Sequence, residues 1–161
     1  MPRFVTIGIV LAAIGGPAIA QATLSAGDRA QAFKAAGFTQ RAGQWRACDD
    51  PGTASYQPGS IETVRDLNGD GRPEAVIVEG STSCFGNTGV GYALVSKQAN
   101  GAWRLIASGP GMVRPLSTEG VGGWPDLEIG GPGFCHPVER WNGRAYAVVR
   151  HQYQGNACRP G

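Results

Sequence analysis

The stretch Ile61–Glu79, IETVRDLNGDGRPEAVIVE, carries most of what can be predicted about this fold. Its two ends are rich in strand-forming residues, and its middle is polar and glycine-rich. The segment Glu74–Glu79 (EAVIVE) is short and mostly apolar, which is typical of a strand covered on both faces. We therefore predict a strand at Ile61–Arg65, a loop at Asp66–Pro73 and a buried strand at Glu74–Glu79.

The loop places oxygen ligands at alternate positions. Asp66, Asn68 and Asp70 occupy positions 1, 3 and 5, and a glycine at position 6 permits a sharp turn. Arg72 at position 7 would offer its backbone carbonyl, and Glu74 at position 9 a further carboxylate. Ligands of oxygen alone favour calcium, then magnesium, and disfavour zinc. The alternative is a tight turn held by its own Asx hydrogen bonds.

This segment resembles the calcium loops of FG-GAP and VCBS-type repeats, and its first six positions also resemble an EF-hand or dockerin loop. It departs from the EF-hand at position 12, where Ile77 replaces the bidentate glutamate, and a strand is expected to follow instead of a helix. The resemblance implies a structural calcium bound by Asp66, Asn68, Asp70, Arg72 and Glu74. The chain is too short for a complete propeller.

Two parts of the chain resemble each other. Pro73–Ile77 aligns with Pro125–Ile129, and farther along the chain Cys84 aligns with Cys135. Both parts also end in an Asn-Gly turn between strand-like segments. We predict two duplicated loop-strand-hairpin units, about 61–108 and 112–152. Chance similarity between glycine-rich strands is the alternative.

The second unit lacks the ligands of the first. Asp66, Asn68 and Asp70 correspond there to Thr118, Gly120 and Gly122. Only Glu74 has an acidic counterpart, Asp126. We therefore expect no metal at the second copy.

The remaining chain predicts one helix and many short strands. Ser25 followed by Asp28 resembles a capping box, so we expect a helix over Ser25–Ala36 buried through Ala30, Phe33 and Phe38. The 26 glycines and 11 prolines favour a strand-rich fold with many turns. The predicted class is α+β, mostly β, with this helix packed on antiparallel strands. Further strands are expected at Gln44–Cys48, Gly91–Lys97, Ala102–Ala107, Met112–Leu116, Asp126–Ile129, Pro137–Trp141 and Arg144–Gln152, with a turn-rich loop at Asp49–Ser60.

Two Asn-Gly pairs predict tight hairpins. Asn100-Gly101 and Asn142-Gly143 each lie between strand-like segments. Such pairs favour two-residue turns, because both positions of that turn require a positive φ.

The N-terminus has the pattern of a secretory signal peptide. Arg3 is followed by the apolar stretch Phe4–Ile14, and Ala18–Ala20 has the small-x-small pattern that signal peptidase cleaves. We predict that residues 1–22 are removed and that 23–161 form a single β-rich domain. A membrane anchor is disfavoured because a span needs about 20 apolar residues. The predicted location is the periplasm or the medium.

Cysteine and charge content agree with export. The four cysteines, Cys48, Cys84, Cys135 and Cys158, predict two disulfides, since none has C-x-x-C spacing for a metal. Three pairings are possible, with a weak preference for Cys48–Cys84 and Cys135–Cys158. Without the signal the chain has 13 basic and 12 acidic residues, a net charge of +1. That balance argues against nucleic acid and against electrostatic membrane binding.

Candidates for catalysis are few. His136 and His151 lie at strand ends, no G-x-S-x-G motif occurs, and we assign no catalytic residue. A Cys135–His136 nucleophile pair is disfavoured because neighbouring strand residues point to opposite faces. Most tryptophans and tyrosines should be core, although an exposed subset could bind a protein or a glycan.

These features favour an exported, non-enzymatic binding module with a structural calcium, two disulfides and a protein or glycan partner. The GDGRPE and WNG-x-x-Y elements also resemble small periplasmic proteins of proteobacteria, a resemblance that implies no activity. A periplasmic inhibitor of a lytic enzyme or protease is the first alternative, and a rigid exposed loop at Phe85–Gly91 would favour it. A calcium-dependent hydrolase is the second, and a pocket beside His136 or His151 would favour that.

Overall fold

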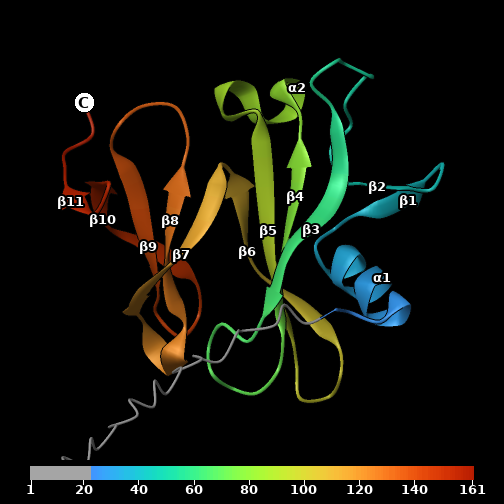
Figure 1. The fold of residues 1–161 in the computed structure, drawn as a ribbon, viewed down its shortest axis with the longest axis horizontal. Coiled ribbons are helices and arrows are strands. Elements are labelled where there is room, and N and C mark those ends of the chain that lie inside the picture. The colour runs from blue at the N-terminus through green and yellow to red at the C-terminus, as the bar shows by residue number, and fades with distance from the viewer. Residues whose placement is uncertain (1–22) are drawn as a thin grey trace, which may run out of the picture.

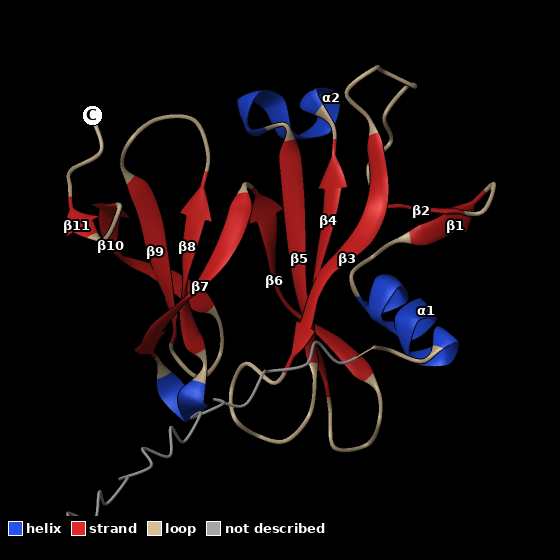
Figure 2. Ribbon diagram, viewed as in Figure 1, coloured by secondary structure: helices blue, strands red, loops and turns tan. Residues whose placement is uncertain are grey.

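The computed structural model describes residues 23–161 as a mostly β protein with three antiparallel sheets (Figures 1 and 2). The predicted signal peptide, residues 1–22, lies outside the described residues. None of the described helices is long and apolar enough to cross a membrane. The predicted class, α+β and mostly β, is confirmed.

Each of the two large sheets is formed by consecutive strands. The first sheet has the order β3-β4-β5-β6, with β3 (Gln57–Arg65), β4 (Glu74–Gly80), β5 (Val90–Lys97) and β6 (Trp103–Pro110). The second sheet has the order β11-β10-β9-β8-β7, with β7 (Met112–Glu119), β8 (Pro125–Gly130), β9 (His136–Trp141), β10 (Tyr146–Tyr153) and β11 (Asn156–Ala157). A small ribbon pairs β1 (Thr39–Arg41) with β2 (Gln44–Arg46). The helices are α1 (Ala26–Ala35), α2 (Thr82–Phe85) and the 3-10 turns η1 (Gly86–Thr88) and η2 (Val121–Gly123).

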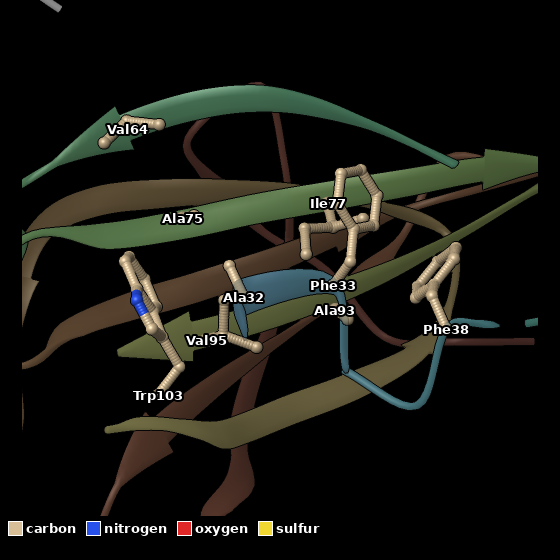
Figure 3. Packing of buried hydrophobic residues seen from close by; sticks show 9 residues of the cluster. All are labelled: Ala32, Phe33, Phe38, Val64, Ala75, Ile77, Ala93, Val95 and Trp103. Atoms are coloured by element: carbon tan, nitrogen blue, oxygen red, sulfur yellow. The ribbon is translucent and has the colours of Figure 1, made fainter. Parts of the chain in front are cut away.

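Helix α1 covers one face of the first sheet. Ser25 caps it as predicted, because its hydroxyl accepts the Asp28 N–H at 3.1 Å. Phe33 is fully buried and stacks on Trp45 with ring centroids 4.8 Å apart. The expected burial of Ala30 is wrong, since Ala32 takes the core position and Ala30 is only partly covered. The hydrophobic core between α1 and the first sheet comprises Ala32, Phe33, Phe38, Val64, Ala75, Ile77, Ala93, Val95 and Trp103 (Figure 3).

The second sheet covers the opposite face of the first. Val76 and Leu94 point away from α1 and pack against Leu127 and Trp141 of the second sheet and against Trp124, which directly precedes β8. The molecule therefore has three layers, α1 with the β1–β2 ribbon, then the first sheet, then the second sheet (Figure 1). This arrangement confirms that β4 is covered on both faces, and residues 74–77 are all buried.

The hairpins occur where predicted, but their turns are longer than two residues. Lys97 pairs with Trp103, and Trp141 pairs with Tyr146, which leaves loops at 98–102 and 142–145. Only the glycine of each Asn-Gly pair has a positive φ, 83° at Gly101 and 96° at Gly143. The asparagines act through their side chains instead. Asn142 Oδ1, for example, accepts the N–H groups of residues 144 and 145.

Other boundaries differ from the prediction for identifiable reasons. β3 begins at Gln57 inside the predicted loop 49–60, and Pro58 is tolerated because β3 is an edge strand. Gly59 lies against Phe38, where a Cβ would come within 2.4 Å of the ring. The predicted strand at 44–48 ends at Arg46. The turns α2 and η1 were not predicted.

Both disulfides form with the preferred pairing, Cys48–Cys84 and Cys135–Cys158. They hold the segments at the end of the sheets that carries α2, whereas the loop at 66–73 lies at the opposite end (Figure 1). β3–β6 and β7–β10 are both runs of four antiparallel strands, with Cys84 and Cys135 in corresponding connections. A duplication of one unit stays a prediction.

Candidate metal loop and buried charge network

The loop between β3 and β4 is organised by Asp66. Its Oδ1 accepts the N–H groups of Gly69 and Asp70 at 2.8 and 3.2 Å, and its Oδ2 accepts that of Gly71 at 2.8 Å. Asn68 Oδ1 accepts the Asp70 N–H at 3.1 Å. The side chains at positions 1 and 3 therefore hold the backbone in a turn with Gly69 and Gly71 at positive φ.

Glu74 closes the loop from inside the protein. It is fully buried, accepting the Leu67 N–H and the Ser96 hydroxyl, both at 2.7 Å. Burial raises the pKa of Glu74, and the carboxylates of Asp70 and Asp66 add to the rise, whereas these two hydrogen bonds oppose it. This carboxylate therefore has hydrogen-bond donors but no ion-pair partner among the described residues.

The loop also joins the two large sheets. Leu67 packs against the core between them. The carbonyl oxygen of Asn68 lies so close to Gly123 that a Cβ there would approach it to 2.6 Å. The predicted ligand loop thus contacts the turn η2 before β8, so its conformation affects how the two large sheets meet.

The donor chemistry of the loop suits a hard cation, because Asp66, Asn68, Asp70 and Glu74 offer only oxygen, apart from the asparagine nitrogen. In the structure, Asp70 forms an ion pair with the Arg72 guanidinium, and Arg72 Nε also donates a hydrogen bond to the Lys97 carbonyl. Among residues 23–161, no three His, Cys, Asp or Glu side chains gather around a common point that could hold a metal ion. Calcium binding would therefore require Asp70 to exchange Arg72 for the ion.

A second cluster of charge lies on the face of the second sheet that points away from the first. Asp126 is fully buried and accepts Arg140 Nε and Nη2 at 2.8 and 2.9 Å. Arg150 Nη1 and the Thr118 hydroxyl also donate to it, at 2.8 and 2.6 Å. The bonds from Arg140 are the largest cause that holds the pKa of Asp126 well below its usual range.

Glu128 lies on the same face, two residues farther along β8. It accepts the Gln152 amide at 2.6 Å, pairs with Arg114, and lies 3.4 Å from His136 Nδ1. Burial alone would raise the pKa of Glu128, but the bonds from Gln152 and His136 and the charge of Arg114 hold it below the ordinary value. The carboxylates of β8 thus fix side chains from β7, β9 and β10.

A groove of about 530 Å³ opens beside this network. Arg150 Nη2 of β10 donates to the Thr118 hydroxyl of β7 at 3.2 Å. Since β7 and β10 are not neighbours in the sheet, the sheet must curl to bring them together. The groove is lined by Arg114, Pro115, Leu116, Ser117, Thr118, Arg150, Gln152, Gln154 and Gly155. The lining contains hydrogen-bond donors and two arginines but no acidic residue.

Comparison with protein-family models, with curated proteins and with solved structures finds no match. The assignment of function therefore rests on the residues and geometry of the chain itself.

A third polar network surrounds the Cys48–Cys84 disulfide and was not predicted. Glu79 accepts the Cys48 N–H at 2.9 Å and the Tyr56 hydroxyl at 3.0 Å. Asp50 accepts the Ser81 hydroxyl, the largest cause that lowers its pKa to about 2. These bonds satisfy backbone groups and position the loop after β4, so we assign them a structural role.

The other candidates from the sequence have mostly structural surroundings. Trp103, Trp124 and Trp141 are buried, which confirms them as core. His136 contacts Glu128 and the edge of the Tyr153 ring. The exposed aromatic side chain that the sequence did not single out is Phe134, which is 76% exposed in the connection before β9.

The charge network is visible in the sequence only as an alternation of polar residues along two strands. Asp126 and Glu128, and likewise Arg150 and Gln152, alternate along their strands with residues of the opposite face. Such alternation predicts a polar face, but it does not reveal which strands will be neighbours.

Proposed function

We propose that this chain is an exported, non-enzymatic binding module whose Asp66–Glu74 loop binds one calcium ion with a structural role. The observation that carries the proposal is the position of the loop between the two large sheets. Leu67 enters the shared core, and the Asn68 carbonyl lies against Gly123. An ion held by this loop would fix the entry to β4 and the junction between sheets.

The charges of the loop support a cation. The buried carboxylate of Glu74 is near Asp66 and Asp70, and their repulsion contributes to its raised pKa. A divalent cation would relieve that repulsion and would replace Arg72 as the partner of Asp70. The arrangement of oxygens at positions 1, 3, 5, 7 and 9 supports calcium, as in the FG-GAP and VCBS-type loops that it resembles.

Export is supported by covalent chemistry. Both pairs of cysteines are disulfide-bonded, and disulfides persist in oxidising compartments. Together with the signal-like residues 1–22, they support a site of action in the periplasm or the medium. A partner there would be a protein or a glycan.

Calcium titration of the purified mature protein tests the proposal. We expect one ion per chain with a dissociation constant on the order of 10⁻⁴ to 10⁻³ M, as for extracellular modules. Asp66→Ala combined with Asp70→Ala should abolish binding measured by calorimetry. Asp49→Ala is the control, because its side chain is 99% exposed and lies outside the loop. Unchanged binding by the double variant would refute the site.

The partner is tested by capture from a periplasmic extract, first in calcium and then in chelator. A structural calcium predicts that capture weakens only as far as the fold loosens. Complete loss of capture in chelator, with an unchanged circular dichroism spectrum, would instead assign the ion to the binding surface.

An inhibitor of a lytic enzyme or protease is a second candidate, favoured by the loop between β4 and β5. The Thr88 hydroxyl donates to the Phe85 carbonyl at 2.6 Å, Ser81 N–H donates to Gly89, and Cys84 anchors the loop covalently. Asn87 at its tip is exposed. These contacts restrain the loop, and a restrained loop loses less entropy on insertion into an enzyme cleft.

Inhibition assays against a lysozyme and a trypsin-like protease test this candidate. Inhibition should weaken in Asn87→Trp, which alters the tip, and persist in Asn100→Trp at the opposite end of the first sheet. If neither the lysozyme nor the protease is inhibited, the inhibitor function is excluded.

A further inference from the structure

We propose that the groove between β7 and β10 is a binding site for a small organic monoanion that carries one carboxylate and several hydroxyl groups. The site comprises Arg114, Ser117 and Thr118 of β7, Arg150 of β10, and Gln154 just after it. This inference deepens the binding function proposed above and rests on it.

The first support is charge. Three guanidinium groups, those of Arg114, Arg140 and Arg150, surround only two carboxylates, Asp126 and Glu128. The network therefore has one unit of positive charge left over when His136 is neutral. A monoanion would balance it, whereas a dianion would leave an excess of negative charge.

The second support is the donors that the network leaves free. Arg114 is anchored through Nη2 to Glu128, yet its Nε and Nη1 donate to no group among the described residues, and its side chain is 60% exposed. The hydroxyl of Ser117 and the side-chain amide of Gln154 likewise have no partner within residues 23–161, and both line the groove. A guanidinium edge beside a hydroxyl and an amide suits a carboxylate that carries hydroxyl groups.

The third support is preorganisation. Arg150 is held by three different residues, through Nε to Gln152, Nη1 to Asp126 and Nη2 to Thr118. Because buried carboxylates fix the arginines before any ligand arrives, little side-chain entropy remains to be lost on binding. The volume of about 530 Å³ is in the range of small-molecule sites and would hold one or two sugar-sized units.

Titration with glucuronate tests the inference, with glucose as the matched neutral ligand and inorganic phosphate as a second anion. Amide chemical shifts followed by NMR should move for glucuronate at Ser117, Thr118, Gln154 and Gly155. Glucuronate should bind at least about tenfold more tightly than glucose, because a charge-assisted hydrogen bond exceeds a neutral one. It should also bind more tightly than phosphate at neutral pH.

Arg114→Gln should weaken glucuronate binding by about tenfold and should leave the fold intact, because the side chain is mostly exposed. Arg104→Gln is the control, since Arg104 is exposed on β6 of the other sheet. Gln154→Ala gives an independent second variant that should also weaken binding. No shifts at millimolar glucuronate, equal binding of glucose or phosphate, or unchanged binding in Arg114→Gln would each overturn the inference.

The test separates this inference from the function proposed above. It is performed in chelator and does not involve the Asp66–Glu74 loop. Failure of the groove would thus leave calcium binding and partner capture to be judged by their own experiments.

Discussion

Glu74 is the first residue of β4 and Asp126 the second residue of β8, both of them internal strands, and both carboxylates are removed from water. Their surroundings differ in charge. Asp126 accepts hydrogen bonds from two arginines. Glu74 accepts them from a backbone N–H and a hydroxyl, and it has two further carboxylates nearby. The pKa of Asp126 is therefore lowered and that of Glu74 is raised. One buried acid stabilises the fold when ionised, and the other when protonated.

The first prediction concerns Asp126 and acid. A lowered pKa contributes stability that is present above about pH 4, the unfolded value, and is lost as the pH falls. Asp50, with its pKa lowered to about 2, acts in the same direction. The free energy of unfolding should therefore decrease from about pH 4 towards pH 2, as measured by urea titration at each pH.

Asp126→Asn removes the part of this pH dependence of stability that comes from Asp126. At pH 7 it should cost about 3 kcal/mol, because Arg140 and Arg150 lose their shared buried partner. Asp49→Asn at the exposed surface is the control and should change stability little. A loss below about 1 kcal/mol for Asp126→Asn would mean that the network contributes little to the fold.

The second prediction concerns Glu74 without calcium. Its raised pKa gives stability that is fully present below about pH 4.3, the unfolded value, and is lost as the pH rises through the folded value. Glu74→Gln removes the buried charge and should raise stability in chelator at pH 7 by roughly 1 kcal/mol. The same substitution should abolish the stabilisation by calcium.

Thermal melts in chelator and in calcium measure both effects in one variant. Glu62→Gln, at an exposed position of β3, is the control and should retain the response to calcium. A melting temperature of Glu74→Gln that still rises with calcium would exclude Glu74 as a ligand.

At the scale of elements, the loop at 66–73 and the turn η2 depend on each other. Gly122 and Gly123 have similar φ values, 67° and 74°. A Cβ at Gly123 would approach the Asn68 carbonyl to 2.6 Å, whereas one at Gly122 would be 3.9 Å from its nearest neighbour, a carbon of Trp124. Comparing alanine substitutions at these two glycines therefore separates the cost of backbone strain from the cost of contact with the loop.

The third prediction is that Gly123→Ala destabilises the protein more than Gly122→Ala. Both should lose about 1 kcal/mol through the positive φ. Gly123→Ala should lose at least about 1 kcal/mol more, because it must displace the loop backbone. It should also weaken calcium binding. Equal effects of the two substitutions on urea unfolding would show that the loop moves away without cost.

At the scale of the whole molecule, the two ends of the sheets are stabilised differently. Two disulfides and the Glu79 and Asp50 networks hold the end that carries α2. The opposite end, with the loop at 66–73 and η2, has no disulfide among the described residues (Figure 1). We therefore expect a bound ion to stabilise the end that lacks covalent links.

The fourth prediction follows for the intact protein. Calcium at ten times its dissociation constant should stabilise the fold by about 1.4 kcal/mol, which raises the melting temperature by a few degrees. The measurement is a thermal melt in chelator and in millimolar calcium, with disulfides intact. A constant melting temperature, with binding confirmed by calorimetry, would assign the ion a functional role instead of a structural one.

The sequence by itself determined the elements whose causes are local. Ser25 and Asp28 define the start of α1, the apolar run at 74–79 defines a strand covered on both faces, and the Asn-Gly pairs define hairpins. The two disulfide partners were also predictable, although only as a preference among three pairings. These features depend on a few consecutive residues or on composition.

The tertiary structure decided what depends on strands that are distant in sequence. Arg140 and Arg150 meet Asp126 only because β9 and β10 follow β8 in one curled sheet, and Thr118 joins them from the far edge strand. The contact of Gly123 with Asn68 likewise requires two sheets to stack. Periodicity in a sequence gives the face on which a side chain lies, whereas sheet curvature and stacking arise from packing summed over the whole core.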